Sequence, residues 1–143
     1  MNRPAPSWPL PQVIDVDREF WNGIQAGRLL IPKCRDCGRR HFFPRPACPE
    51  CLGANLEWEP ASGRGTVYSF SLVRVPRAPA VRAHVEATGA PVIFVEVRLN
   101  EGIRVLARLV GTRPEDVTLG MPVAAAFEPP PGTEFKLPCF RPV

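Results

Sequence analysis

The segment CRDCGRRHFFPRPACPEC, residues 34–51, decides the expected fold of the first part of this chain. It holds four cysteines, arranged as two pairs with two residues inside each pair and ten between the pairs: Cys34, Cys37, Cys48 and Cys51. Two C-x-x-C turns that face each other present four thiolates as a tetrahedral set, which is the arrangement that Zn²⁺ favours. The spacing therefore predicts a zinc ribbon, with iron in a rubredoxin-like site as the alternative.

All four expected ligands come from the protein, so the metal would have no open position for water or substrate. The site is therefore predicted to be structural and to hold folded a short segment that buries little surface alone. Two disulfides are the competing interpretation of the four cysteines. The start of the chain, MNRPAPSWPLPQ, lacks the cationic-then-apolar layout of a secretory signal. We expect a cytoplasmic protein, and thiols stay reduced in that compartment.

The remaining composition is that of one globular domain. The 143 residues are 45% hydrophobic and 22% charged, and no apolar stretch approaches the ~18 residues that a membrane-spanning helix needs. We divide the chain into an extended proline-rich arm at 1–15, a helix with the ribbon at 16–60, and a β-barrel with a C-terminal tail at 61–143.

A short helix is expected directly before the ribbon. Phe20, Trp21 and Ile24 recur at helical spacing before Gly27 ends the pattern. These bulky side chains either pack on the chain's own domain or face a partner, because a lone helix before a small ribbon has little core of its own to cover it. We take all three, together with Phe140 in the C-terminal tail, as candidate partner contacts.

From about residue 63 onward, runs of strand formers are broken by turn residues at the spacing of a small barrel or sandwich. In GTVYSFSLVRV, residues 65–75, the alternation places Tyr68, Phe70 and Leu72 on one side, which we assign to the core. PVIFVEVRL (91–99) and IRVLARLVG (103–111) read as a hairpin, and PVAAAFE (122–128) is the next strand. The predicted fold is mainly β: an N-terminal helix, a rubredoxin-like zinc ribbon and a closed OB-fold barrel.

Two parts of the barrel half stand apart from this pattern. Residues 76–90, PRAPAVRAHVEATGA, show no clear strand or helix periodicity, so we expect a long loop that is either disordered or used in gating or docking. Cys139 is far in sequence from both histidines, His41 and His84. We expect it to be a small semi-buried residue rather than a nucleophile.

Cations gather on the expected ribbon. Of the 18 lysines and arginines, five lie within residues 33–45, where Asp36 is the only acid: Lys33, Arg35, Arg39, Arg40 and Arg45. The planar fork of donors on arginine suits phosphate. The cluster is either the solvated face of a basic protein or an anion-binding patch.

The order of the segments resembles a known family. FWNGIQAGRLLIPKC leads into the ribbon, GTVYSFSLVR begins the barrel, NEGIRVLARLVG and LGMPV continue it, and LPCFRP closes it. From about residue 16 to its end, the chain resembles the zinc-ribbon OB-fold proteins associated with acyl-CoA enzymes. The resemblance implies an accessory subunit that is not catalytic alone but is required by a thiolase-like enzyme.

In such a complex the resemblance implies that this chain helps to hold the acyl-CoA, while the partner performs thiolytic, retro-aldol or acyl-transfer chemistry. A hot-dog-fold enoyl-CoA hydratase is the alternative partner. The sequence agrees with this division of labour, because it has no G-x-S-x-G motif and no acid/base pair at useful spacing. We expect Arg35, Arg39, Arg40 and Arg45 to contact the phosphates of coenzyme A. His41, Phe42 or Phe43 would stack on its adenine, and Phe42 is taken as the candidate.

Two other functions compete with this one. Ribbons and OB barrels also bind nucleic acid, but the barrel half sets ten cations against seven acids and so lacks a continuous cationic groove. We therefore expect no nucleic acid and no membrane as partner. The third interpretation makes the chain an enzyme on its own, with Cys139 or His84 as the reactive group.

Overall fold

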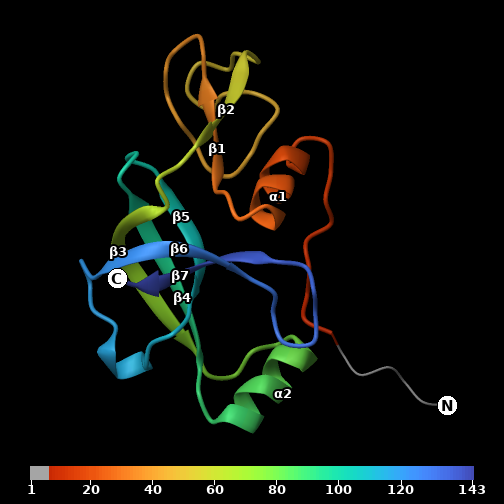
Figure 1. Cartoon of the computed structure of the whole chain (residues 1–143), viewed down its shortest axis with the longest axis vertical. Coiled ribbons are helices and arrows are strands. Elements are labelled where there is room, and N and C mark those ends of the chain that lie inside the picture. Colours follow the sequence, from red (N-terminus) through yellow and green to blue (C-terminus); the bar gives the residue numbers. More distant parts are fainter. Residues whose placement is uncertain (1–6) are drawn as a thin grey trace, which may run out of the picture.

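The structure is a computed structural model that describes residues 7–143. Two α-helices, one short 3₁₀ turn and seven strands follow one another in this part of the chain (Figure 1). In chain order they are α1 (Arg18–Gln25), β1 (Leu30–Cys34), β2 (Leu56–Pro60), β3 (Arg64–Val73), α2 (Pro79–Thr88), β4 (Val92–Leu99), β5 (Arg104–Leu109), η1 (Pro114–Asp116), β6 (Pro122–Glu128) and β7 (Leu137–Pro142). No helix in the described range has the length and apolar character to cross a membrane.

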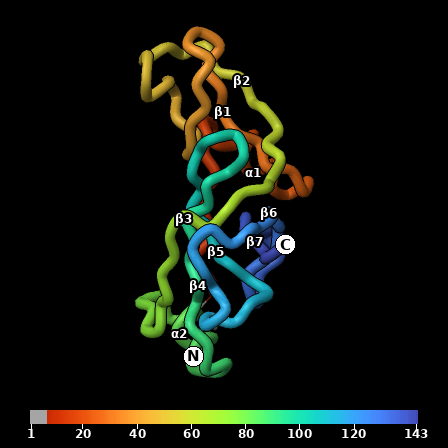
Figure 2. Tube along the Cα trace, turned by 90° about the vertical axis from the view of Figure 1, so that its left-hand side faces the viewer, coloured from red at the N-terminus to blue at the C-terminus, as the bar shows by residue number. Residues whose placement is uncertain are grey.

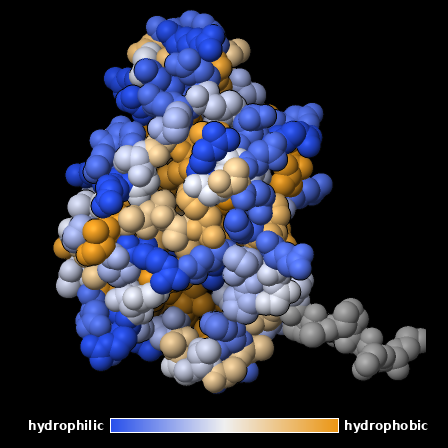
Figure 3. Space-filling view, viewed as in Figure 1, coloured by the Kyte–Doolittle hydropathy of each residue, from blue (hydrophilic) through white to orange (hydrophobic). Residues whose placement is uncertain are grey.

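The molecule is elongated, with the ribbon at one end, the barrel in the middle and α2 at the opposite end (Figures 1 and 2). Strands β1 and β2 pair antiparallel as the two-stranded sheet of the ribbon. Helix α1 lies beside this sheet, where the ribbon meets the barrel. On the face drawn in Figure 3 the ribbon end is mainly hydrophilic, whereas apolar side chains gather over the barrel.

The five remaining strands form a closed barrel in the order β3-β4-β5-β7-β6. All of its strand pairs are antiparallel except β5 with β7, which run parallel. The predicted combination of helix, zinc ribbon and five-stranded OB-type barrel is confirmed. The segment expected as a C-terminal tail contributes β7, a strand of the barrel wall.

Helix α1 packs inside the chain's own core instead of presenting an apolar face. Phe20 and Ile24 have no exposed surface, Trp21 is 7% exposed, and Phe140 in β7 is 1% exposed. All four belong to one hydrophobic cluster that also holds Ile31 of the ribbon and the inward residues of the barrel. These four side chains are therefore core residues and not the exposed partner contacts that we expected. The barrel and the ribbon together cover the apolar face of the helix.

The expected long loop at 76–90 contains helix α2. Pro79 occupies its first turn, where the missing N–H costs nothing, and Gly89 ends it in the left-handed conformation with φ of 68°. Only Ala80 and Val81 of the helix are buried. The helical period was therefore too weak to be recognised in the sequence.

A β-bulge turns Tyr68 to the outside of the barrel, whereas we expected it in the core. The β3–β4 register shifts between Val67 and Ser69, so Tyr68 is the extra residue, and it is 45% exposed. Its ring lies outside the barrel, with the Cζ atoms of Arg98 and Arg104 at 4.8 and 4.6 Å from the ring centroid. After the bulge, Leu72 pairs with the buried Ile93 and packs against the core, as expected. Phe70 pairs with the buried Val95 but is 36% exposed and does not belong to the core cluster, so its expected place in the core is wrong.

Candidate metal centre and ribbon surface

The four ribbon cysteines come together at the end of the molecule away from α2. The sulfur atoms of Cys34 and Cys51 are 3.6 Å apart, and those of Cys37 and Cys48 are 3.7 Å apart. All four sulfur atoms lie within 4.8 Å of one another. A tetrahedron with Zn–S bonds of about 2.3 Å has sulfur–sulfur edges of about 3.8 Å, so the four thiols fit a bound Zn²⁺ or iron ion.

The two knuckles repeat the same backbone turn. The amide of Gly38 donates to the Cys34 carbonyl at 2.9 Å, and the amide of Leu52 donates to the Cys48 carbonyl at 2.9 Å. Each turn then needs a residue at positive φ: Gly38 adopts 74° and Leu52 adopts 62°. Glycine meets this requirement freely, whereas leucine adopts it with strain.

Backbone amides prepare one of the thiols for metal binding. The amides of Cys51 and Glu50 donate to the sulfur of Cys48 and lower its pKa to about 7. Thiolate is the form that ligates metal. Cys34 and Cys48 are buried, while Cys37 and Cys51 are exposed. Within residues 7–143, this is the one group of three or more cysteine, histidine or acidic side chains placed to hold a metal ion.

His41 follows the first knuckle but lies outside the set of four ligands. The side chain is 7% exposed, and neither ring nitrogen has a hydrogen-bond partner. Burial lowers its pKa, and the nearby positive charge of Arg45 lowers it further. His41 is thus a packed, neutral imidazole at the base of the ribbon.

Most of the ribbon arginines are paired with acids that the sequence interpretation overlooked. The pairs, with nitrogen–oxygen distances where quoted, are Arg35 with Glu57 (3.0 Å), Arg39 with Glu50 (3.4 Å), and Arg40 with Glu59. Glu57 and Glu59 reach the arginines because β2 pairs with β1. Both glutamates follow their arginine partners by 19 or more residues, so a count of charges within residues 33–45 does not include them. No ion pair among residues 7–143 includes Arg45.

The pairing weakens the cationic patch without abolishing it. Exposed ion pairs of this kind contribute about 0–1 kcal/mol each, so a phosphate could compete for the guanidinium groups. Phe42 is only partly exposed, and its ring centroid is 5.7 Å from that of the buried Phe20. Phe43 is 38% exposed and is the more accessible aromatic residue of this segment.

The structure does not bring Cys139 together with His41 and His84 as a catalytic site. Cys139 is completely buried in β7, where its thiol lies 3.4 Å from the Ala126 carbonyl oxygen. Burial raises the pKa of this thiol. His84 lies on α2, and its ring forms a T-shaped pair with that of Trp8 at a centroid distance of 5.6 Å.

Comparison with known proteins identifies both parts of the fold. Residues 21–57 match the family model described as "ChsH2, rubredoxin-like zinc ribbon domain", and residues 58–128 match "ChsH2, C-terminal OB-fold domain". A "DUF35 domain-containing scaffold protein" of Methanocaldococcus jannaschii is 34% identical over 109 residues, covering 75% of this chain and 73% of the relative.

Relatives with enzyme names match over different lengths. A "probable enoyl-CoA hydratase alpha subunit" of Thermomonospora curvata is 34% identical over 142 residues, and a "benzoylsuccinyl-CoA thiolase subunit BbsA" of Geobacter metallireducens is 34% identical over 79 residues. The chain spans 40% of the first relative and 48% of the second.

A solved structure covers nearly all of the chain. A chain of the structure described as "Ltp2-ChsH2(DUF35) aldolase" is 31% identical with a TM-score of 0.78, and the match covers 93% of this chain and 98% of that one. The ribbon, α1 and the barrel therefore recur together as a unit.

Proposed function

This chain belongs to the ChsH2 (DUF35) family of zinc-ribbon OB-fold proteins, and on that premise we propose that it is a non-catalytic accessory subunit. Its partner in this proposal is a thiolase-like enzyme that acts on an acyl-CoA thioester by thiolytic, retro-aldol or acyl-transfer chemistry. The partner contributes the reacting groups, and the complex works in the cytoplasm, where the four thiols stay reduced.

The observation that carries the proposal is the match to a chain of an aldolase structure, which covers 93% of this chain and 98% of that one. The subunit name of the thiolase relative agrees with it. The chemistry of the described residues also supports it, since the four-sulfur metal set is complete without water or substrate, and Cys139 is completely buried.

A hydratase partner is the second candidate. It is favoured by the alignment with the enoyl-CoA hydratase alpha subunit, which extends over 98% of this chain. The chain spans only 40% of that relative. In this case another polypeptide would supply the part of the hydratase subunit that this chain does not match.

Within the complex we propose that the ribbon contacts the phosphates of coenzyme A through Arg35, Arg39, Arg40 and Arg45, with Phe42 against the adenine. Each guanidinium exchanges an exposed carboxylate for a phosphate, which accepts charge-assisted hydrogen bonds of similar geometry. The accessible Arg45 lies in the same segment and adds an unpaired charge.

Co-expression tests the assignment. The chain is produced with and without the thiolase-like or hydratase-like protein encoded nearest to it, and the complex is examined by size-exclusion chromatography and assayed with acyl-CoA. We expect a stable complex whose turnover requires this chain. A chain that turns over acyl-CoA alone, or that leaves every such partner unbound and unchanged, would contradict the proposal.

Kinetics of the complex test the coenzyme A contact separately. The double variant Arg39→Ala and Arg40→Ala is expected to raise the KM for acyl-CoA while the metal content stays unchanged. Arg18→Ala with Arg113→Ala is the matched control, because both of these residues also form exposed ion pairs but lie outside the ribbon. An equal effect of the two double variants would reject the ribbon contact.

A further inference from the structure

A second candidate site lies on the outer surface of the barrel, apart from the ribbon. Here a cavity of about 300 Å³ is bounded by β4 and β5, α2, the start of β7, helix α1 and the arm before α1. Its apolar wall includes Val81, Phe94, Leu106 and Leu137. Leu106 is 65% exposed, which is high for a leucine in a strand. Small-molecule sites begin at about 300 Å³, so the cavity has room for one small ligand.

The polar side-chain groups that line the cavity are all hydrogen-bond donors. They belong to Trp8, Trp21 and Arg108, and no Asp, Glu, Ser, Thr, Asn or Gln side chain lines it. Two of the donors, the indole Nε1 of Trp21 and the Nε of Arg108, are buried without a hydrogen-bond partner. Trp21 as a whole is only 7% exposed. A buried donor without an acceptor carries a cost of about 1–3 kcal/mol. Because neither nitrogen has accessible surface, a small side-chain shift must bring it to the cavity wall, where a ligand acceptor would relieve this cost.

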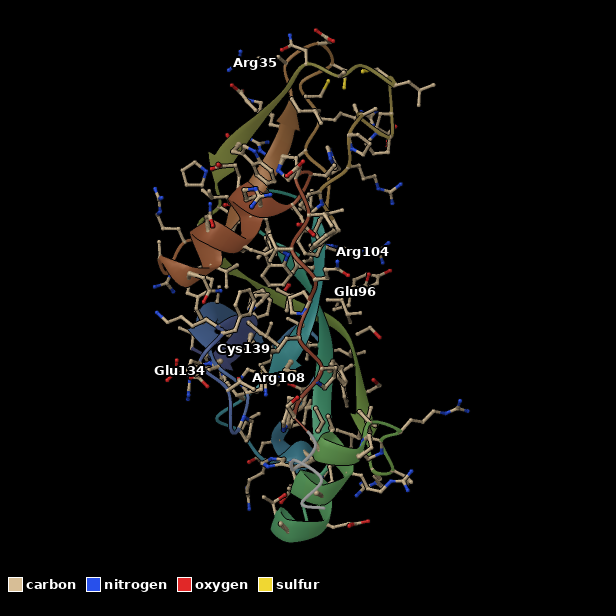
Figure 4. All side chains as sticks on the ribbon, turned by 90° about the vertical axis from the view of Figure 1, so that its right-hand side faces the viewer. Arg35, Glu96, Arg104, Arg108, Glu134 and Cys139 are labelled. Atoms are coloured by element: carbon tan, nitrogen blue, oxygen red, sulfur yellow. The ribbon has the colours of Figure 1, made fainter. Side chains whose placement is uncertain are left out.

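The charge of Arg108 is also uncompensated. None of the ion pairs in the described range includes it, although Arg104, two residues earlier on the same strand, pairs with Glu96 at 3.3 Å. Figure 4 shows Arg108 beside Cys139 and nearer to α2 than Arg104 and Glu96 are. Instead of a carboxylate, Arg108 faces the Trp8 ring, whose centroid is 5.2 Å from its Cζ atom.

We propose that this cavity binds a free organic carboxylate with an apolar body, such as a medium-chain fatty acid. The carboxylate accepts hydrogen bonds from Arg108 and from the Trp21 indole, and the chain lies against Phe94, Leu106 and Leu137. An acceptor-only anion complements a site whose polar side chains are all donors, and the apolar wall selects against small inorganic anions. The proposal does not rest on the accessory-subunit function, since it concerns the isolated chain.

Tryptophan indole N–H signals in two-dimensional NMR spectra of the full chain test the site directly. Octanoate is the probe, and each of the three indole signals is assigned with a Trp→Phe variant. We expect octanoate to shift the Trp21 and Trp8 signals and to leave that of Trp58 in β2 unchanged, because Trp58 does not line the cavity. Octanol, which has the chain without the charge, and acetate, which has the charge without the chain, are expected to bind at least about tenfold more weakly.

Two variants test whether Arg108 is the cation that binds the carboxylate. Arg108→Gln is expected to weaken octanoate binding about tenfold or more, whereas Arg104→Gln on the same strand is expected to leave it unchanged. A Trp21 signal that does not respond to octanoate would overturn the proposal. Equal binding of octanol and octanoate would also overturn it, and this comparison needs only the wild-type chain. Equal losses in the two variants would place the anion elsewhere on the surface and reject the site.

Discussion

Replacement of Phe20 by alanine distinguishes a core role of helix α1 from a partner-binding role. The Phe20 side chain has no exposed surface, and its ring centroid lies 4.9 Å from that of Trp21, 5.7 Å from that of Phe42 and 5.2 Å from that of Phe43. Truncation of a buried phenylalanine to alanine costs about 3–5 kcal/mol. The three aromatic neighbours place Phe20→Ala at the upper end of this range, because each ring pair adds about 0.5–1.5 kcal/mol beyond burial.

The expected loss of about 4–5 kcal/mol can be measured without any partner. For a chain of this size, 1 kcal/mol shifts the Tm by about 4 °C, so Phe20→Ala should melt about 16–20 °C below the wild type. Asn22→Ala, on the exposed face of the same helix, is the matched control and should change stability by no more than about 0.5 kcal/mol. Differential scanning fluorimetry and urea unfolding of the purified, metal-loaded chain provide the comparison.

The refuting result is equally specific. If Phe20→Ala melts within a few degrees of the wild type but no longer co-purifies with a partner enzyme, then the helix serves the interface and the assignment to the core fails. Loss of both properties would agree with the core assignment, since a partner would then be lost through unfolding.

Three further predictions concern the ribbon. Cys48→Ser should reduce metal binding, measured by mass spectrometry of bound metal, from one ion per chain, and it should remove hydrogen-exchange protection in the knuckles while the barrel strands keep theirs. Leu52→Asn should raise the stability by about 0.5–1 kcal/mol, seen as a higher Tm, because asparagine adopts the left-handed conformation at lower cost than leucine; an unchanged or lower Tm would reject strain at this position. His41 has a lowered pKa, so the unfolded chain binds the proton more readily, and stability should fall as the pH drops below the ordinary histidine pKa of about 6.5 and level off below the folded pKa. Urea unfolding from pH 8 to pH 5 tests this, and His41→Phe should show a smaller dependence on pH in that range.

The metal site was the most predictable part of the molecule. Its four ligands lie within eighteen residues, and the geometry of a C-x-x-C turn is local, so the spacing alone predicts the convergence of Cys34 with Cys51. The strands of the barrel were predictable for the same reason, since alternation along 91–99 and 103–111 directly records which side chains face inward.

Features that depend on contacts between distant segments could not be predicted. The cavity beside Arg108 is built from Trp8, Trp21 and Leu137, which come from the arm, α1 and β7, and no local pattern connects them. The exposed position of Tyr68 depends on one extra residue in β3, which reverses the alternation at that point. Glu59 neutralises Arg40 only because β1 and β2 pair in one particular register.

The place of β7 in the barrel bears on the order of folding during synthesis. Residues Leu137–Pro142 are inserted between β5 and β6, parallel to the first and antiparallel to the second. While a ribosome still holds them, β5 and β6 each have an unpaired edge, of the kind that invites association with other chains. The metal knuckles, finished some ninety residues earlier, can already be assembled at that moment. Nascent chains should thus acquire their ion first and complete the barrel only after β7 has left the ribosome.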